Sequence, residues 1–170
     1  DCVRVNFYAP SEAELVLPGK KPVRLKQTTD YPRTDQIEIE VDPAKETAFT
    51  IALRIPAWSK IAVVSVNGQP QDGVLQGAYL PVNRKWKKGD RITVKLDLRA
   101  RLVERNQAQA IVRGPIVLAR DSRFGDGFVD EASVVVSKDG YVALTPVKAP
   151  GFAWLAFTVP MVLGTDLESN

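Results

Sequence analysis

The chain has 170 residues, which is enough for one domain, or for one domain and a small second one. Its 23 Lys and Arg residues against 20 Asp and Glu give a net charge of +3, and the basic residues are scattered, so we expect no nucleic-acid partner. The longest apolar runs fall far short of a membrane span, and the lack of histidine excludes a Ser-His-Asp triad, a Cys-His pair and a His-based zinc site within this sequence.

The single cysteine, Cys2, excludes an intrachain disulfide and any Cys-x-x-Cys metal or redox motif. Val3, Val5 and Phe7 follow it with the two-residue period of a strand. We therefore expect Cys2 to be a small buried hydrophobe rather than a reactive nucleophile. Because the chain begins with Asp1 and shows no signal peptide, we expect a processed or excised piece whose targeting segment cannot be read.

Apolar residues alternate with polar ones along the first hundred residues, as they do in strands with one buried face. Turn residues such as Pro18-Gly19, Asn67-Gly68 and 88–90 separate the alternating segments. We expect at most one helical turn, beginning at Asp42-Pro43 with Asp42 as its cap. The expected strands are 3–7, 13–17, 23–29, 37–41, 49–55, 62–66, 79–84 and 92–98.

The clearest pattern lies in residues 49–68. A first alternating strand ends at Pro56, which lacks a backbone donor, and a second ends at the tight-turn pair Asn67-Gly68. Two strands, a proline-marked corner and a tight turn predict a central hairpin in an antiparallel sheet. Strands of this length at regular spacing, with no long helices between them, predict an all-β fold, an antiparallel β-sandwich of the jelly-roll-like type.

The character of the sequence changes near Arg99. Residues 99–109 are polar and compatible with a short helix, whereas 110–119 are mostly apolar, which we interpret as one strand that is buried on both faces and bends at Gly114-Pro115. We expect a β-sandwich domain over residues 1–104 and further strands over 105–170, either in the same sandwich or in a small second β-unit. The further strand candidates are 134–136, 141–144 and 153–159.

Several short clusters stand in an order typical of one family. The clusters are 5–11, 27–32, 53–58 with 66–68, then Tyr79 with Arg84, Trp86 and Gly89-Asp90, and finally 113–115. Over residues 3 to 119 they resemble the β-sandwich region that follows the catalytic domain in glycoside hydrolase family 127, the β-L-arabinofuranosidase-type enzymes. The remainder of the chain resembles that family only loosely, and Arg33 and Asp35 stand where members usually have Trp and Gly.

The resemblance implies a catalytic (α/α) helical barrel amino-terminal to this region. In the family that barrel carries a cysteine nucleophile, zinc-binding cysteines, a glutamate ligand and a glutamate acid/base, none of which we carry over to Cys2. The chain is therefore expected to be a non-catalytic accessory domain that packs against and shapes the barrel, with no catalytic residue and no cofactor of its own. The family also favours a periplasmic or secreted location.

Two readings of the shared aromatic residues remain open. The simpler hypothesis is that the large side chains of Trp58 and Trp86 fill or cover the core, since residues typical of β-sandwich sequences usually serve packing. Alternatively, the chain is a carbohydrate-binding module whose aromatic side chains stack on an arabinose-containing carbohydrate. The candidates for such stacking are Tyr31, Trp58, Tyr79, Trp86 and Trp154.

An acidic loop suggests a third hypothesis, a calcium site, because calcium takes several hard oxygen ligands on a flexible loop. Its acidic residues fit no known calcium-loop spacing, and a solvated acidic loop is far commoner, so we assign no metal ligand. The calcium candidates are Asp121, Asp126, Asp130 and Glu131.

Overall fold

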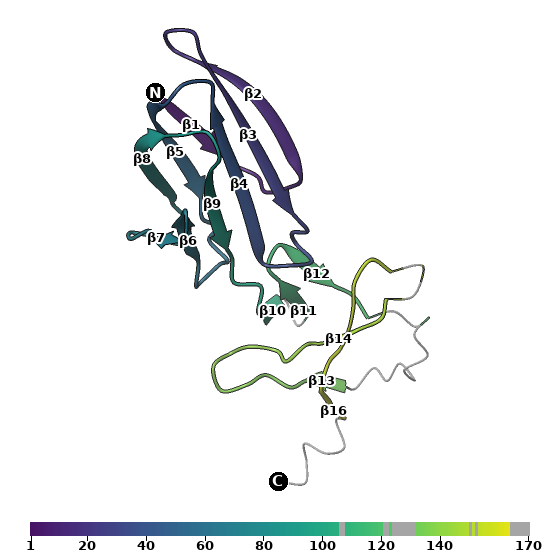
Figure 1. Cartoon of the computed structure of the whole chain (residues 1–170). Helices are drawn as coiled ribbons and strands as arrows, with labels where there is room; N and C mark the ends of the chain where they lie inside the picture. The colour runs from purple at the N-terminus through teal and green to yellow at the C-terminus, as the bar shows by residue number, and fades with distance from the viewer. Residues whose placement is uncertain (106–107, 121–122, 124–131, 150, 152, 164–170) are drawn as a thin grey trace. The chain divides into compact units, whose positions relative to one another are not determined.

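The computed structural model describes residues 1–105, 108–120, 123, 132–149, 151 and 153–163. The chain divides into two compact units, Asp1–Leu98 and Arg99–Asn170, which are considered separately below. Every regular element of the described residues is a β-strand, which confirms the predicted all-β class (Figure 1).

The first unit is a sandwich of two sheets. Three strands form one sheet in the order β1 (Cys2–Val5), β5 (Thr47–Arg54), β8 (Tyr79–Trp86). Six strands form the other sheet in the order β2 (Ser11–Leu17), β3 (Lys21–Thr29), β4 (Gln36–Pro43), β9 (Asp90–Lys95), β6 (Val63–Val66), β7 (Gln69–Pro70). All neighbours pair antiparallel except β1 and β5, which run parallel.

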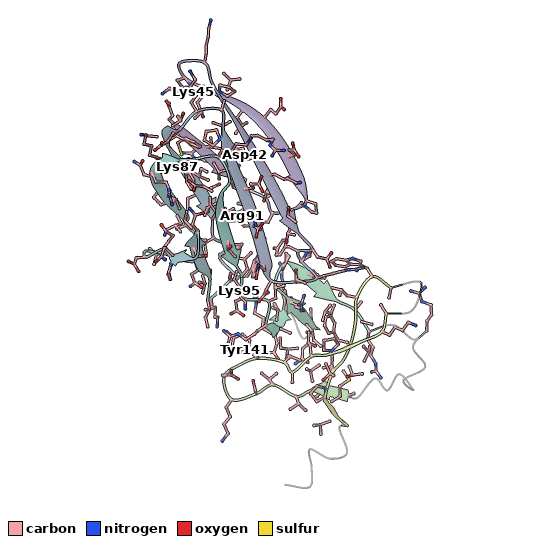
Figure 2. The ribbon with its side chains drawn as sticks, in the orientation of Figure 1. Asp42, Lys45, Lys87, Arg91, Lys95 and Tyr141 are labelled. Atoms are coloured by element: carbon pink, nitrogen blue, oxygen red, sulfur yellow. The ribbon has the colours of Figure 1, made fainter. Side chains whose placement is uncertain are left out.

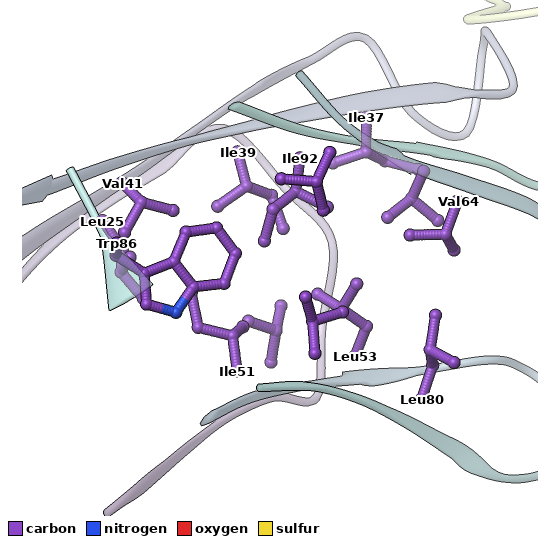
Figure 3. Close-up of a cluster of buried hydrophobic side chains, with 14 of the residues drawn as sticks. Leu25, Ile37, Ile39, Val41, Ile51, Leu53, Val64, Leu80, Trp86 and Ile92 are labelled. Carbon is purple, nitrogen blue, oxygen red and sulfur yellow. The ribbon is translucent and has the colours of Figure 1, made fainter. Parts of the chain in front are cut away.

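The core lies between these sheets, and period-two burial builds it. On β4, Ile37, Ile39 and Val41 are fully buried while the residues between them face partly outward. Figure 3 shows these side chains opposite Ile51 and Leu53 of the three-stranded sheet. The predicted antiparallel β-sandwich is confirmed, and the predicted inward residues of β5 are buried as expected.

The predicted central hairpin is wrong, because its two strands lie in different sheets. β5 pairs with β1 and β8, whereas β6 pairs with β9 and β7. The chain crosses between the sheets after Pro56, so the proline marks a crossover instead of a hairpin corner. The predicted turn at Asn67-Gly68 is present: both residues have positive φ, 50° and 79°, and the turn joins β6 to β7.

Two further predictions near the strand ends are wrong. Asp42-Pro43 starts no helical turn but ends β4 in extended geometry, since the Asp42 carboxylate binds Arg24 and the amide of Gly89 instead of capping its own backbone. Cys2 is exposed, not buried. Because Val5 faces the core, the alternation along β1 places Cys2 on the opposite side.

The second unit contains short antiparallel strands. They are β10 (Ala100–Arg105), β11 (Ala108–Arg113) and β12 (Ile116–Leu118) in one sheet, β13 (Ala132–Val134) with β16 (Met161–Leu163), and β14 (Thr145–Val147) with β15 (Ala156–Thr158).

The helix interpretation of residues 99–109 is wrong, because β10 is a strand that pairs with the apolar β11. The interpretation of 110–119 as one bent strand is also wrong. Gly114, with a φ of 58°, and Pro115 form the turn between β11 and β12. Val117 is 64% exposed, so the run is not buried on both faces. The calcium candidates Asp121, Asp126, Asp130 and Glu131 lie outside the described residues.

Candidate functional site

Residues 6–10 join β1 to β2 and so connect the two sheets; we call them the crossover segment. The hydroxyl of Tyr8 donates a hydrogen bond to the backbone oxygen of Arg54 at 2.8 Å. The hydroxyl of Tyr79, on β8, donates to Asn6 Oδ1 at 2.6 Å. These two bonds attach the segment to both β5 and β8 of the three-stranded sheet.

The other side of the crossover segment is attached to the six-stranded sheet. Gln27 Nε2, on β3, donates to the backbone oxygen of Phe7 at 3.3 Å and to Ser11 Oγ at 3.0 Å. The segment is therefore hydrogen-bonded to three strands, β3, β5 and β8.

Tyr8 and Tyr31 form the aromatic centre of this region. Their rings meet edge to face, with centroids 6.4 Å apart. Burial raises the pKa of Tyr31 to about 12. Burial, and then the neighbouring Tyr31, raise the pKa of Tyr8 well above its usual range. Both phenols are therefore neutral at physiological pH, and Tyr8 keeps the proton that it donates to Arg54.

Phe7 is 78% exposed, whereas Val5 and Tyr8 are buried. The sequence pattern predicted that it would continue the inward face of Val3 and Val5. That prediction is wrong: β1 ends at Val5, and Tyr8 is the residue that turns into the core. Other large apolar side chains of the described residues are exposed too, among them Val16 and Leu75, and single exposed residues of this kind are ordinary on a folded surface.

Two arginines lie beside Tyr79. The Arg4 guanidinium is 6.0 Å from the centre of the Tyr79 ring, and Arg54 is the cross-strand partner of Tyr79. Tyr79 itself is 44% exposed. We call Arg4, Asn6, Arg54 and Tyr79 together the crossover surface.

The predicted aromatic candidates occupy different environments. Trp86 is fully buried, and its Nε1 donates to the backbone oxygen of Phe49 at 3.0 Å. Trp58 is partly buried against the core. Tyr31 and Tyr79 both adjoin the crossover segment, whereas Trp154 is 50% exposed and belongs to the second unit.

Sequence reasoning did not single out Phe7 and Tyr8 as site candidates. Two adjacent aromatic residues at the end of an alternating strand carried a usable signal, since they cannot both face the core of an extended chain.

A second polar cluster surrounds Asp90, at the turn between β8 and β9. Asp90 accepts hydrogen bonds from the Lys87 amide at 2.9 Å and from Asn67 Nδ2 at 2.8 Å, and Arg84 lies 3.6 Å away. Burial alone would raise the pKa of Asp90, but these donors and the Arg84 charge outweigh it and lower the pKa. Asp90 therefore serves as a charged turn anchor and is poorly suited to act as a general acid.

Charged residues also cover the outer face of the six-stranded sheet, and Figure 2 labels Asp42 on β4 and Arg91 on the neighbouring β9. Arg24 Nη2 lies 2.6 Å from Asp42 Oδ2, and this hydrogen bond lowers the pKa of Asp42. Arg24 Nη1 lies 3.1 Å from Glu12 Oε1. An open hollow beside this network, between β2, β3 and the end of β4, has no aromatic residue in its lining.

Within the described ranges, no three His, Cys, Asp or Glu side chains gather closely enough to hold a metal ion. Among the same residues, no helix has the length and apolar character needed to cross a membrane.

Comparison with known families identifies the chain. Residues 2–98, more than half of the sequence, match the family described as the β-L-arabinofuranosidase, GH127 middle domain. The chain therefore belongs to glycoside hydrolase family 127, as the order of its sequence clusters indicated. A comparison with curated proteins finds no match.

Solved structures agree with this assignment. A protein described as a glycoside hydrolase has a TM-score of 0.77 and 27% identity over 92% of this chain and 27% of its own. A GH127 β-L-arabinofuranosidase from Geobacillus stearothermophilus T6 has a TM-score of 0.77 and 25% identity over 94% of this chain and 26% of its own. A GH127 β-arabinofuranosidase has a TM-score of 0.69 and 27% identity over 95% of this chain and 31% of its own. The chain thus spans between a quarter and a third of the length of these relatives.

Proposed function

We propose that this chain is a non-catalytic accessory domain of a family 127 glycoside hydrolase, which packs against the catalytic helical barrel and shapes the edge of its active-site cleft. The observation that carries the proposal is the match of residues 2–98 to a middle domain, in relatives whose chains are three to four times longer. A middle domain has neighbours on the same polypeptide, and its surface is selected to fit them.

The chemistry of the described carboxyl groups supports a structural role. Asp42 and Asp90 both have lowered pKa values, because each accepts hydrogen bonds and lies near an arginine. A glycosidase needs one carboxyl group with a raised pKa to act as general acid, opposite a second carboxylate. These two well-paired carboxylates therefore act as anchors of the fold.

The test is to titrate a family 127 catalytic barrel, expressed without its own middle domain, with this chain. We expect a 1:1 complex by calorimetry and a rise in the melting temperature of the barrel. At a chain concentration of about 100 times Kd, binding stabilises the barrel by about 2.7 kcal/mol. Absence of both binding and stabilisation would contradict the proposal.

Carbohydrate binding is the second candidate function. Tyr79 favours it, since its half-exposed ring lies beside Asn6, Arg4 and Arg54, which supply directional hydrogen-bonding groups. The two candidates differ in a simple titration with arabino-oligosaccharides at millimolar concentration. A sugar-binding module shows saturable heat or fluorescence changes that Tyr79→Ala abolishes, whereas the accessory domain shows neither.

A further inference from the structure

We propose that the crossover surface binds an acidic sugar, a uronic acid unit whose carboxylate lies between the guanidinium groups of Arg4 and Arg54 and whose ring lies against Tyr79. This inference rests on carbohydrate binding, the second candidate function, and it deepens that candidate by naming the class of sugar. It does not depend on how the chain packs against a catalytic barrel.

The strand register places both arginines and the tyrosine on the outer face of the three-stranded sheet. Arg4 on β1 pairs with Ala52 on β5. Arg54, two residues further along β5, pairs with Tyr79 on β8. Side chains two residues apart along a strand lie on the same face, and Leu53, between Ala52 and Arg54, is buried in the core. Arg4, Arg54 and Tyr79 are all exposed, so they share one solvent-facing surface.

The charge on this sheet has a single sign. β1, β5 and β8 contain no Asp or Glu, although they carry Arg4, Arg54, Arg84 and Lys85. Arg84 and Lys85 each lie within ion-pair distance of a carboxylate from outside these strands. Among the described residues, neither Arg4 nor Arg54 has a carboxylate within that distance. Two exposed guanidinium groups without a carboxylate on their own sheet attract an anion from solution.

The side chains of the crossover surface offer mainly hydrogen-bond donors. Asn6 Oδ1 already accepts the Tyr79 hydroxyl proton at 2.6 Å, so the amide nitrogen of Asn6 keeps its two hydrogens for another acceptor. A guanidinium has five N–H donors and no acceptor. A neutral sugar needs acceptors as well as donors, because each of its hydroxyl groups carries a proton to donate, whereas an ionised carboxylate only accepts. A surface of donors therefore favours a sugar that carries a carboxylate.

The positions of Arg4 and Tyr79 suit a ring with an attached carboxylate. The Arg4 guanidinium is 6.0 Å from the centre of the Tyr79 ring, at the outer limit of a cation–π contact, so it lies near the ring without being fully engaged by it. The ring is 44% exposed and offers an apolar surface to a sugar ring. The planar fork of an arginine then binds the carboxylate through two parallel hydrogen bonds.

The experiment titrates the whole 170-residue chain by calorimetry with trigalacturonate, its methyl ester, arabinotriose and a triglutamate peptide. The methyl ester keeps the sugar rings and removes the charge, whereas the peptide keeps the charge and removes the sugar rings. We expect saturable binding of trigalacturonate, with a Kd that rises with salt concentration. Binding of the methyl ester and of the peptide should be weaker by about tenfold or more.

Variants test whether the crossover surface holds the sugar. Arg4→Gln and Arg54→Gln should each raise the Kd for trigalacturonate about tenfold, because each removes charge-assisted hydrogen bonds. The matched control is Arg91→Gln, which removes the same charge from the outer face of the six-stranded sheet, where Arg91 lies 3.2 Å from Glu38. It should change Kd less than about twofold. All three arginines are exposed, so the variants should unfold at the wild-type temperature.

If trigalacturonate does not bind, or if Arg4→Gln and Arg54→Gln bind it as tightly as the wild type does, the inference is overturned. Equal affinities for trigalacturonate and the triglutamate peptide would also overturn it, since the surface would then attract any polyanion. If arabinotriose binds and trigalacturonate does not, carbohydrate binding stands and the acidic class of sugar is wrong. Binding to the catalytic barrel is measured separately, so these results leave the accessory role untouched.

Discussion

The indole of Trp86 spans the interior of the sandwich and donates its Nε1 hydrogen to the backbone oxygen of Phe49, 3.0 Å away. The two rings contact each other at 5.9 Å between centroids, with planes tilted by 43°. Trp86 therefore fills the core and satisfies its own polar atom at the same time, which is what a buried indole requires. Figure 3 shows it beside Val41 of the opposite sheet.

Replacement of Trp86 should be the most damaging single core change. Trp86→Ala is expected to lower the free energy of unfolding by about 3–5 kcal/mol, since it removes a fully buried aromatic ring and leaves a cavity. Trp86→Phe should cost less, but still loses the hydrogen bond to Phe49, worth about 1 kcal/mol. Urea unfolding followed by circular dichroism measures both. An equal free energy of unfolding for Trp86→Ala and the wild type would show that Trp86 does not stabilise the core.

The Asp90 turn anchor predicts an acid-dependent loss of stability. The pKa of Asp90 lies below its ordinary value of 3.8, so its charge stabilises the folded state above that pH, and this stabilisation is lost as the pH falls through the folded pKa. Asp90→Asn should therefore lower the free energy of unfolding by about 1–2 kcal/mol at neutral pH. The difference from wild type should shrink below about pH 4. A difference that stays constant with pH would contradict this assignment.

Tyr31 predicts an alkaline loss of stability. Burial raises its pKa from 10.0 to about 12, so the folded state holds the phenol proton more tightly than the unfolded state does. The contribution is complete below pH 10 and is lost as the pH rises toward 12. Across this pH range the free energy of unfolding should fall less steeply with pH for Tyr31→Phe than for the wild type. If the free energy of unfolding falls equally steeply with pH for both proteins, burial does not raise the pKa of Tyr31.

Cys2 should react with a thiol reagent in the folded chain. It is exposed on the outward side of β1, and it is the only cysteine in the sequence, so any modification reports on this residue alone. Mass spectrometry should find one modification per chain without denaturant, at a rate close to that of the unfolded protein. If Cys2 reacts with the reagent only after the chain unfolds, its side chain is buried in the folded state.

The sequence predicted the strands of the sandwich well because burial with a period of two is a local signal. Ile37, Ile39 and Val41 are buried as their alternation requires. It did not predict that β5 and β6 lie in different sheets, since a proline-marked corner looks the same in a hairpin and in a crossover. The choice depends on distant partners, here β8 and β9, which local patterns cannot name.

The candidate site was harder to predict for a related reason. The alternation along β1 suggested that Phe7 would be buried, but β1 ends two residues earlier and Tyr8 takes the inward position. The inward Tyr8 donates a hydrogen bond to Arg54, 46 residues away, a partner that a local pattern cannot name. The sequence clusters did contain both aromatic residues, so the family signature marked the region before its geometry could be inferred.

The central claim is that this domain is a scaffold and that the reactive groups belong to a neighbouring barrel. Its most direct test is the hydrolysis of a chromogenic β-L-arabinofuranoside by the purified chain, by a family 127 barrel lacking its middle domain, and by their equimolar mixture. We predict no hydrolysis by the chain alone and higher or longer-lasting activity in the mixture than in the barrel alone. Hydrolysis by the unaccompanied chain would contradict the account.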